Sequence, residues 1–189
     1  MTRRSSILDT VYEKDSSSNA FIIKVSIRSY KDIFNDLDPA PFRKRDLDPD
    51  LRTYLEDSSI DIPLKNKISL QFSASEQIKD REKEKKVILG LKTYFQFIIR
   101  TFQKEISHEY RKGGVYIICS FVLLLLAYYL SSIIPDHFLL ITLVEGLFIG
   151  GWVFLWEAIA VVVFKNREIR LKLKRYRRLN KAPIRFIYE

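Results

Sequence analysis

The most apolar part of the chain consists of two long stretches separated by three residues. Residues 114–134 contain no charged residue, and residues 138–164 contain only Glu145 and Glu157. About 20 apolar residues are enough for a helix to cross a bilayer core of roughly 30 Å. The pattern therefore predicts an α-helical transmembrane hairpin over residues 113–164, with spans at 114–134 and 138–164.

Apolar residues in the first half of the chain are spread over shorter elements. Residues 21–27 are rich in β-branched side chains, and residues 67–73 alternate apolar with polar positions, which is typical of strands. A short helix is predicted over residues 50–57 and a long one over residues 75–112. Together these elements predict an α+β domain, a short β-α-β-α unit with a small sheet, over residues 20–112.

The long helix is predicted from an apolar stripe that continues to the membrane segment. Apolar residues recur every three or four positions from Val87 to Ile106. Because the pattern reaches Gly113 and Gly114, we expect the helix to run into the first span, with the glycine pair as a bend. Residues 1–19 are polar, and are predicted to be a disordered lead without a signal peptide.

Residues 36–50 are dense in proline and aspartate and predict an ordered loop before the short helix. Asp48 or Pro49 is a typical helix start. Asx turns, caps and pairs between arginines and neighbouring acids would use the loop's polar side chains. A divalent cation is the alternative, since it prefers oxygen ligands, but the spacing is not that of an EF-hand. We expect structure and no metal, with the structural residues Asp36, Asp38, Arg45, Asp46 and Asp48.

Charge divides the chain into three parts. Residues 1–112 carry a net charge of +4, residues 113–164 carry −3 without any Lys or Arg, and residues 165–189 carry +8. Basic residues thus flank both spans, while the connection between the spans has none. The positive-inside rule predicts that both termini lie in the cytoplasm. The domain at 20–112 and a basic tail at 165–189 would then both be cytoplasmic.

Glu145 and Glu157 are unusual because a carboxylate at membrane depth costs about 2.5–3.5 kcal/mol. In a homo-oligomer either glutamate could line a cation pathway or gate, since acidic rings select cations. Trp152 and Trp156 lie close by in the sequence and are candidates for the same pore or gate. The alternative is that Glu145 lies near the headgroups and that Glu157 reaches a nearby Lys or Arg.

Gly146 and Gly150 form a small-residue pair that would let two helices approach closely. At about 100° per residue, Glu157 falls within roughly 40° of both glycines. Glu145 projects to the side of Trp152. We therefore expect Gly146 and Gly150 to be the helix-packing residues.

The tail places apolar residues at helical spacing among many basic ones. This pattern favours contact with the anionic inner leaflet, at about 1 kcal/mol per basic residue. Contact with nucleic-acid phosphates is the alternative. The candidate contact residues in the tail are Arg170, Lys172, Lys174, Arg175, Arg177 and Arg178. The domain before the spans offers Lys65, Lys67, Arg81, Lys83, Lys85 and Lys86 for nucleic acid.

Candidate chemistry is sparse. The chain contains no P-loop, dinucleotide-binding glycine motif, zinc-protease motif or nucleophile elbow. Cys119 is the single cysteine, which excludes a disulfide framework, and His108 and His137 would lie on opposite sides of the membrane. We expect neither an enzyme nor a cofactor.

Residues 36–48 read DLDPAPFRKRDLD and resemble the signature of a broad bacterial family of small two-span membrane proteins. The resemblance extends to Glu145-Gly146-Leu147, to Gly151-Trp152-Val153 and to a strand-like stretch at 183–186, and so covers nearly the whole chain. It departs at Trp156-Glu157, where a basic or polar residue is expected in relatives.

The chain is also similar to the membrane effectors of anti-phage systems of the Hailong type. That resemblance implies a bacterial inner-membrane channel held closed by a DNA oligomer, which a nucleotidyltransferase makes. Two spans cannot enclose a water path alone, so we expect a homo-oligomer, with a tetramer as the working number. The expected partners are membrane lipid, a DNA oligomer and its nucleotidyltransferase. The alternative function is a non-conducting membrane scaffold that recruits a cytoplasmic partner.

Overall fold

The computed structural model describes residues 8–16, 18–41, 45–133 and 138–189. These residues form two compact units. The α/β unit comprises the described residues up to Thr101 together with Leu173–Glu189. The hairpin unit comprises the described residues of Phe102–Lys172. Part of the predicted basic tail therefore belongs to the α/β unit.

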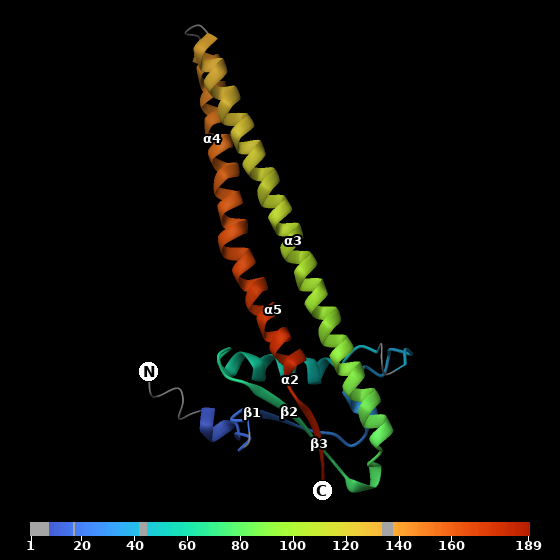
Figure 1. Cartoon of the computed structure of the whole chain (residues 1–189). Helices are drawn as coiled ribbons and strands as arrows, with labels where there is room; N and C mark the ends of the chain where they lie inside the picture. The colour runs from blue at the N-terminus through green and yellow to red at the C-terminus, as the bar shows by residue number, and fades with distance from the viewer. Residues whose placement is uncertain (1–7, 17, 42–44, 134–137) are drawn as a thin grey trace. The chain divides into compact units, whose positions relative to one another are not determined.

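The α/β unit is built on a parallel sheet of three strands. Strands β1 (Phe21–Ser26), β2 (Ile68–Ala74) and β3 (Ile184–Tyr188) lie side by side with β2 in the centre (Figure 1). The predicted small sheet is thus present, with both expected strands. Its third strand comes from the tail, which the prediction had placed outside the domain.

The two faces of the sheet differ sharply in polarity. Val25, Phe72 and Phe186 lie in register on one face. On the other face, Lys24, Gln71 and Arg185 lie in register. Parallel sheets are usually covered on both faces, but the alternation here leaves one face apolar and the other polar. The apolar face and the helices beside it form the core.

Three helices supply the rest of that core. They are α2 (Pro49–Asp61), the start of α3 (Arg81–Ile133) and the end of α5 (Asn166–Lys181). The 3-10 helix η1 (Tyr30–Ile33) adds Tyr30 and Ile33. The buried apolar and aromatic side chains of these helices are Leu51, Leu55, Val87, Leu91, Tyr94, Phe95, Leu173, Tyr176 and Leu179.

Helix α2 begins as its sequence predicts. The Asp48 carboxylate accepts hydrogen bonds from the backbone N–H groups of Asp50 and Leu51 at 3.0 and 3.1 Å, and Pro49 is the first helical residue. The helix continues to Asp61, four residues beyond the predicted end at Asp57. Ser58 and Ser59 of this added turn are buried, so the extension packs against the core.

Residues 13–15 of the predicted disordered lead pair with β1 and the residue before it. The backbone N–H of Ile22 donates to the Glu13 carbonyl at 2.8 Å, and that of Asp15 donates to the Ala20 carbonyl at 2.9 Å. Lys14 and Phe21 form an antiparallel bridge. The prediction of disorder was therefore wrong for these residues, because they satisfy backbone groups at the outer edge of β1. Residues 1–7 and 17 lie outside the described residues.

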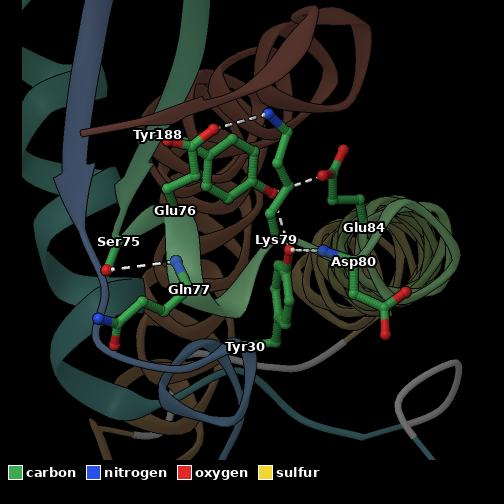
Figure 2. Close-up of polar contacts among 8 residues, drawn as sticks. All are labelled: Tyr30, Ser75, Glu76, Gln77, Lys79, Asp80, Glu84 and Tyr188. Atoms are coloured by element: carbon green, nitrogen blue, oxygen red, sulfur yellow. Dashed lines mark hydrogen bonds and ion pairs between the residues drawn. The ribbon is translucent and has the colours of Figure 1, made fainter.

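Helix α3 starts six residues later than predicted. Ser75 caps the short 3-10 helix η2 (Glu76–Ile78) instead, and the Asp80 carboxylate accepts from the backbone N–H groups of Glu82 and Lys83, both at 3.0 Å. The hydroxyl of Tyr188 donates to Glu84 in the first turn, and the Tyr30 hydroxyl accepts from the backbone N–H of Asp80 at 3.1 Å (Figure 2). From Arg81 the helix runs without a break to Ile133, so it continues into the first predicted span as expected. Gly113 and Gly114 lie within this continuous helix, and the bend expected there stays a prediction.

The hairpin unit consists of the later part of α3, helix α4 (Phe138–Ala160), the π-helical turn η3 (Val161–Lys165) and the start of α5. The helices Arg81–Ile133 and Phe138–Lys181 are each long and apolar enough to cross a membrane. The connection at 134–137 lies outside the described residues. The prediction of two apolar helices that could span a membrane is thus confirmed.

Candidate anion-binding pocket

A pocket of about 510 Å³ lies in the α/β unit between two segments that are far apart in the sequence. One segment, residues 64–68, connects α2 to β2, and the other comprises the last turns of α5 and the start of the chain that enters β3. The basic residues that line it are Lys65, Lys67, Lys174, Arg177, Arg178 and Lys181. None of the described residues that line it is acidic.

The amphipathic pattern of α5 places its basic residues at this pocket. Leu173, Tyr176 and Leu179 are buried in the core of the α/β unit. Lys174 directly follows Leu173 and Arg177 directly follows Tyr176, and both basic side chains are exposed. The apolar stripe of the tail is therefore core rather than a surface for lipid. Protein covers this stripe in the second half of α5, so a contact with lipid there would have to use the exposed basic residues, and that contact stays a prediction.

Backbone pairing fixes the opposite wall. The backbone N–H of Leu70 and the hydroxyl of Ser69 both donate to the Pro183 carbonyl, at 2.9 and 3.4 Å. Ile68 is buried at the start of β2, and a turn precedes it in which the backbone N–H of Asn66 donates to the Pro63 carbonyl at 2.9 Å. Lys65 and Lys67 are thereby held beside the chain that leaves α5.

Arg178 is a structural residue of this region. Its guanidinium donates to the carbonyls of Ser59, Ile62 and Pro63 at 2.6, 3.0 and 2.8 Å. These carbonyls belong to the C-terminal end of α2, where a cation also interacts favourably with the helix dipole. Burial, together with nearby Arg175, lowers the pKa of Arg178 below its ordinary value. Arg178 was predicted as a ligand contact, but most of its donors are already used.

Lys92 has a matching role on α3. Its ammonium donates to the carbonyls of Asn180 and Ala182, the latter at 2.7 Å, where α5 ends. Burial lowers the pKa of Lys92. The role of Lys92 was not predicted, because a lysine within a charged helix gives no signal of a contact 88 residues away. Lys92 and Arg178 together hold the end of α5 that forms the pocket.

The remaining five basic side chains are exposed and have no carboxylate partner among the described residues. These are Lys65, Lys67, Lys174, Arg177 and Lys181. Like charges gathered in a concave site raise the local concentration of anions. The other lining residues are Leu64, Asn66, Ile68, Ala182 and Pro183, so the described lining contains no aromatic ring on which a nucleobase could stack. The chemistry of the pocket thus fits phosphate groups.

The other predicted basic contacts lie elsewhere. Arg170 lies over the ring of Tyr110 and Lys172 pairs with Glu168 at 3.1 Å, all in the hairpin unit. Arg175 is half-buried and does not line the pocket. On α3, Lys83 pairs with Asp80 at 3.2 Å. Lys85 pairs with Glu82 at 2.8 Å. Arg81 and Lys86 do not line the pocket.

The aspartate-rich loop uses its carboxylates for turns. Asp38 accepts from the backbone N–H groups of Ala40 and Asp46, both at 2.9 Å, and these bonds hold its pKa below the ordinary value. The Arg45 guanidinium donates to the Ala40 carbonyl at 3.0 Å. Asp36 is exposed, and Phe42 and Arg43 lie outside the described residues. Among the described residues, no group of three His, Cys, Asp or Glu could hold a metal.

The packing glycine of the hairpin is Gly151. A Cβ atom there would lie 3.3 Å from the Ser120 carbonyl, and the Ser120 hydroxyl donates to the Gly151 carbonyl at 2.7 Å. No atom lies within 4 Å of a Cβ at Gly146, and the nearest to one at Gly150 is 3.7 Å away. Within the hairpin the tightest of these three glycine positions is thus Gly151 rather than Gly146 or Gly150, and packing of Gly146 and Gly150 between copies stays a prediction. The buried stripe of α4, which includes Val144, passes one residue away from them.

Both candidate glutamates are exposed on the outside of the hairpin. Glu145 and Glu157 lie about 120° to either side of Gly151 on α4, at about 100° per residue. Trp152 and Trp156 flank Glu145 on the helix surface and are 55% and 66% exposed. Within one copy, the hairpin therefore buries none of these four side chains.

One buried ionic contact of the hairpin was missed. The carboxylate of Glu109 on α3 is 4% exposed and pairs with Lys165 at 2.9 Å and with Lys112 at 3.5 Å. The hydrogen bond from Lys165 holds the pKa of Glu109 below its usual value. Asn166, which follows in the chain, is buried. The two helices meet here through residues 56 positions apart, which the sequence does not reveal.

Comparison with known proteins returned no match, whether to a protein-family model, to a curated protein or to a solved structure.

Proposed function

We propose that the protein is a homo-oligomeric effector of the bacterial inner membrane, a ligand-gated ion channel that acts in anti-phage defence. Its ligand would be a nucleic-acid oligomer or a nucleotide bound at the basic pocket. The observation that carries this proposal is the convergence on one pocket of five cations that have no carboxylate partner in the described part of the chain. The same chain has two apolar helices of membrane-spanning length.

The pocket favours a ligand that carries several phosphates. Lys65 and Lys67 approach from one segment and Lys174 and Arg177 from the other, so that two phosphates could be neutralised at once. A volume of about 510 Å³ lies within the usual range of roughly 300–1,000 Å³ for small-ligand sites. Binding would be strongly salt-dependent, because each neutralised phosphate releases counterions.

The hairpin favours an oligomer. Charged side chains within membrane helices usually face protein or water rather than lipid. Glu145 and Glu157 are both exposed on the outside of the hairpin, so a single copy leaves them to lipid. Neighbouring copies in a ring would remove at least one of them from lipid and could place it along a cation path.

The order of the chain gives the pocket a route to the hairpin. The pocket residues Lys174 and Arg177 belong to α5, and the helix Phe138–Lys181 joins α5 to α4 without a break. In this proposal the closed and open channels hold α5 in different positions. A ligand that binds one of these two conformations more tightly would shift the balance between closed and open channels. The basic residues on both sides of the spans favour cytoplasmic termini, where an intracellular signal would reach the pocket.

The test is ion flux in liposomes that contain the purified full-length protein, with and without a short DNA oligomer. We expect cation flux that the oligomer changes. The variant Lys67→Glu with Arg177→Glu should keep the flux and lose its response to the oligomer. The matched control is Lys83→Glu with Lys85→Glu, which reverses two charges outside the pocket and should respond like wild type.

Two outcomes contradict the proposal. Absence of flux in every condition would favour the non-conducting scaffold. Equal responses in both double variants would show that the pocket is not the ligand site.

In cells, Glu145→Gln or Glu157→Gln should relieve the growth arrest and loss of membrane potential caused by overexpression. Unchanged arrest in both variants at equal expression would contradict a role for these glutamates in the pore.

A further inference from the structure

The third strand of the sheet has one open side. The outer side of β1 is covered by residues 13–15, which pair with it. Strand β3 pairs with β2 alone, and no backbone hydrogen bond from another described residue reaches its outer side. An exposed strand edge is a template for pairing with another chain.

The backbone groups that face outward can be assigned from the parallel ladder. The N–H of Glu189 donates to the Ala74 carbonyl at 3.1 Å, and the Pro183 carbonyl accepts from Leu70 at 2.9 Å. Alternate residues of a strand direct their N–H and carbonyl groups to the same neighbour. Residues 185 and 187 therefore face β2, and residues 184, 186 and 188 direct their backbone groups outward.

The side chains of those outward-facing residues are committed to the core. Phe186 stacks on Phe72 with ring centroids 5.3 Å apart, and the Tyr188 hydroxyl lies 2.7 Å from that of Tyr30 (Figure 2). Arg185, Ile187 and Glu189 consequently occupy the polar face of the sheet. Ile187 remains 39% exposed there. Natural edges are often protected by proline or a bulge, and β3 (IRFIY) contains neither.

We propose that β3 pairs antiparallel with β3 of a second copy of this chain, with the twofold axis at Ile187. The backbone groups of Phe186 and Tyr188 then bond to those of Tyr188 and Phe186 in the other copy. Ile187 meets its own equivalent, and Arg185 lies opposite Glu189 on both sides of the axis. The inference concerns self-association of the α/β unit and stands whether or not the protein conducts ions.

Charge complementarity selects a second copy as the occupant of this edge. Opposite charges directly across two strands are favourable, and like charges are unfavourable. Arg185 contacts Asp15 of its own chain at 3.4 Å through one guanidinium nitrogen, and its side chain remains 58% exposed. In the antiparallel arrangement each copy also supplies Arg185 to one charge pair and Glu189 to the other, and apolar Ile187 fills the space between them. A parallel pairing in the same register would place Arg185 beside its own equivalent. The strand is thus complementary to itself in one direction only.

The first test is disulfide formation in the full-length protein in detergent. In the proposed pairing, Ile187 and its equivalent in the other copy form a non-hydrogen-bonded pair. Their two Cα atoms would lie about 4.5 Å apart, which is within the range of a disulfide. Ile187→Cys in a Cys119→Ser background should give a covalent dimer on mild oxidation. Gln71→Cys is the matched control, since it lies on the same face but on the central strand. Equal rates for the two variants would overturn the proposal.

The second test exchanges the charges. In the Ile187→Cys background, Glu189→Arg should slow dimer formation several-fold, because it sets two arginines against each other. Adding Arg185→Glu should restore the rate, because each cross-strand pair is again opposite in charge. All variants of this test also carry Asp15→Asn, because Arg185 pairs with Asp15 in its own chain at 3.4 Å. Circular dichroism should show that all variants remain folded. A slow rate in the double exchange would contradict the proposed register, and an unaffected rate in Glu189→Arg would contradict the pairing.

Discussion

Gly151 of α4 lies directly against Leu124 of α3, so that a Cβ atom at Gly151 would be 2.7 Å from Leu124 Cγ. Real Cβ atoms do not approach other atoms so closely, and the Ser120 carbonyl limits movement on the same side. The two helices therefore pack tightly at a position where α4 has no side chain.

Gly151→Ala should separate the two helices of the hairpin. We expect a loss of about 1–3 kcal/mol, the usual effect of overpacking, measured as a lower thermal midpoint in detergent. Gly146→Ala is the matched control, because a Cβ there has open space around it. Equal midpoints in the two variants would contradict this close approach.

Arg178→Lys should destabilise the α/β unit although it keeps the charge. A lysine cannot reproduce the fork that spans the Ser59, Ile62 and Pro63 carbonyls. Charge-assisted hydrogen bonds contribute about 1.5–3 kcal/mol each, and we expect a loss of that size in denaturant unfolding. Arg177→Lys, on the exposed neighbour, should unfold like wild type. A stable Arg178→Lys protein would show that the guanidinium is not the cap of α2.

The loop before α2 should respond to acid through Asp38. Because the pKa of Asp38 is lowered below its usual 3.8 in the folded state, its ionised form stabilises the fold above that value. This contribution is lost as the pH falls through the lower, folded-state pKa. Asp38→Asn should therefore be less stable than wild type near neutral pH, and the difference should shrink in strong acid. Asp36→Asn, at an exposed position, should track wild type, and a pH-independent difference for Asp38→Asn would contradict the assignment.

Lys165 and Glu109 should behave as a coupled pair. Removing Lys165 leaves the buried Glu109 carboxylate with only the longer contact to Lys112, so Lys165→Met should destabilise the hairpin. Adding Glu109→Gln should recover part of that loss, because the buried charge is then absent. Lys172→Met is the control, since Lys172 belongs to an exposed pair with Glu168. Additive effects of the two substitutions in thermal unfolding would rule out the coupling.

Periodicity predicted the local elements well. The alternation at residues 67–73 and the stripe from Val87 to Ile106 correspond to β2 and α3, and Asp48 with Pro49 starts α2. These features arise from neighbours in the sequence, through strand alternation, helix turns and caps. The sequence therefore reveals them without knowledge of the fold.

What the sequence did not predict depends on contacts between distant segments. The stripe of α5 looks the same whether lipid or protein covers it, and only the fold shows that Leu173 and Tyr176 are core residues. Likewise, neighbouring Arg177 and Arg178 have the same chemistry. One faces the pocket freely and the other caps α2, because adjacent residues on a helix point about 100° apart.

The position of β3 in the chain has a consequence for biosynthesis. The ribosome makes β1 and β2 first, then both apolar helices, and β3 last. Until residues 184–188 emerge, β2 remains an unprotected edge, and Lys92 lacks the carbonyls that it binds at the end of α5. The α/β unit can close only after the hairpin has been synthesised. A chain interrupted within the hairpin would therefore carry an incomplete sheet, with the edge of β2 open to pairing with another chain.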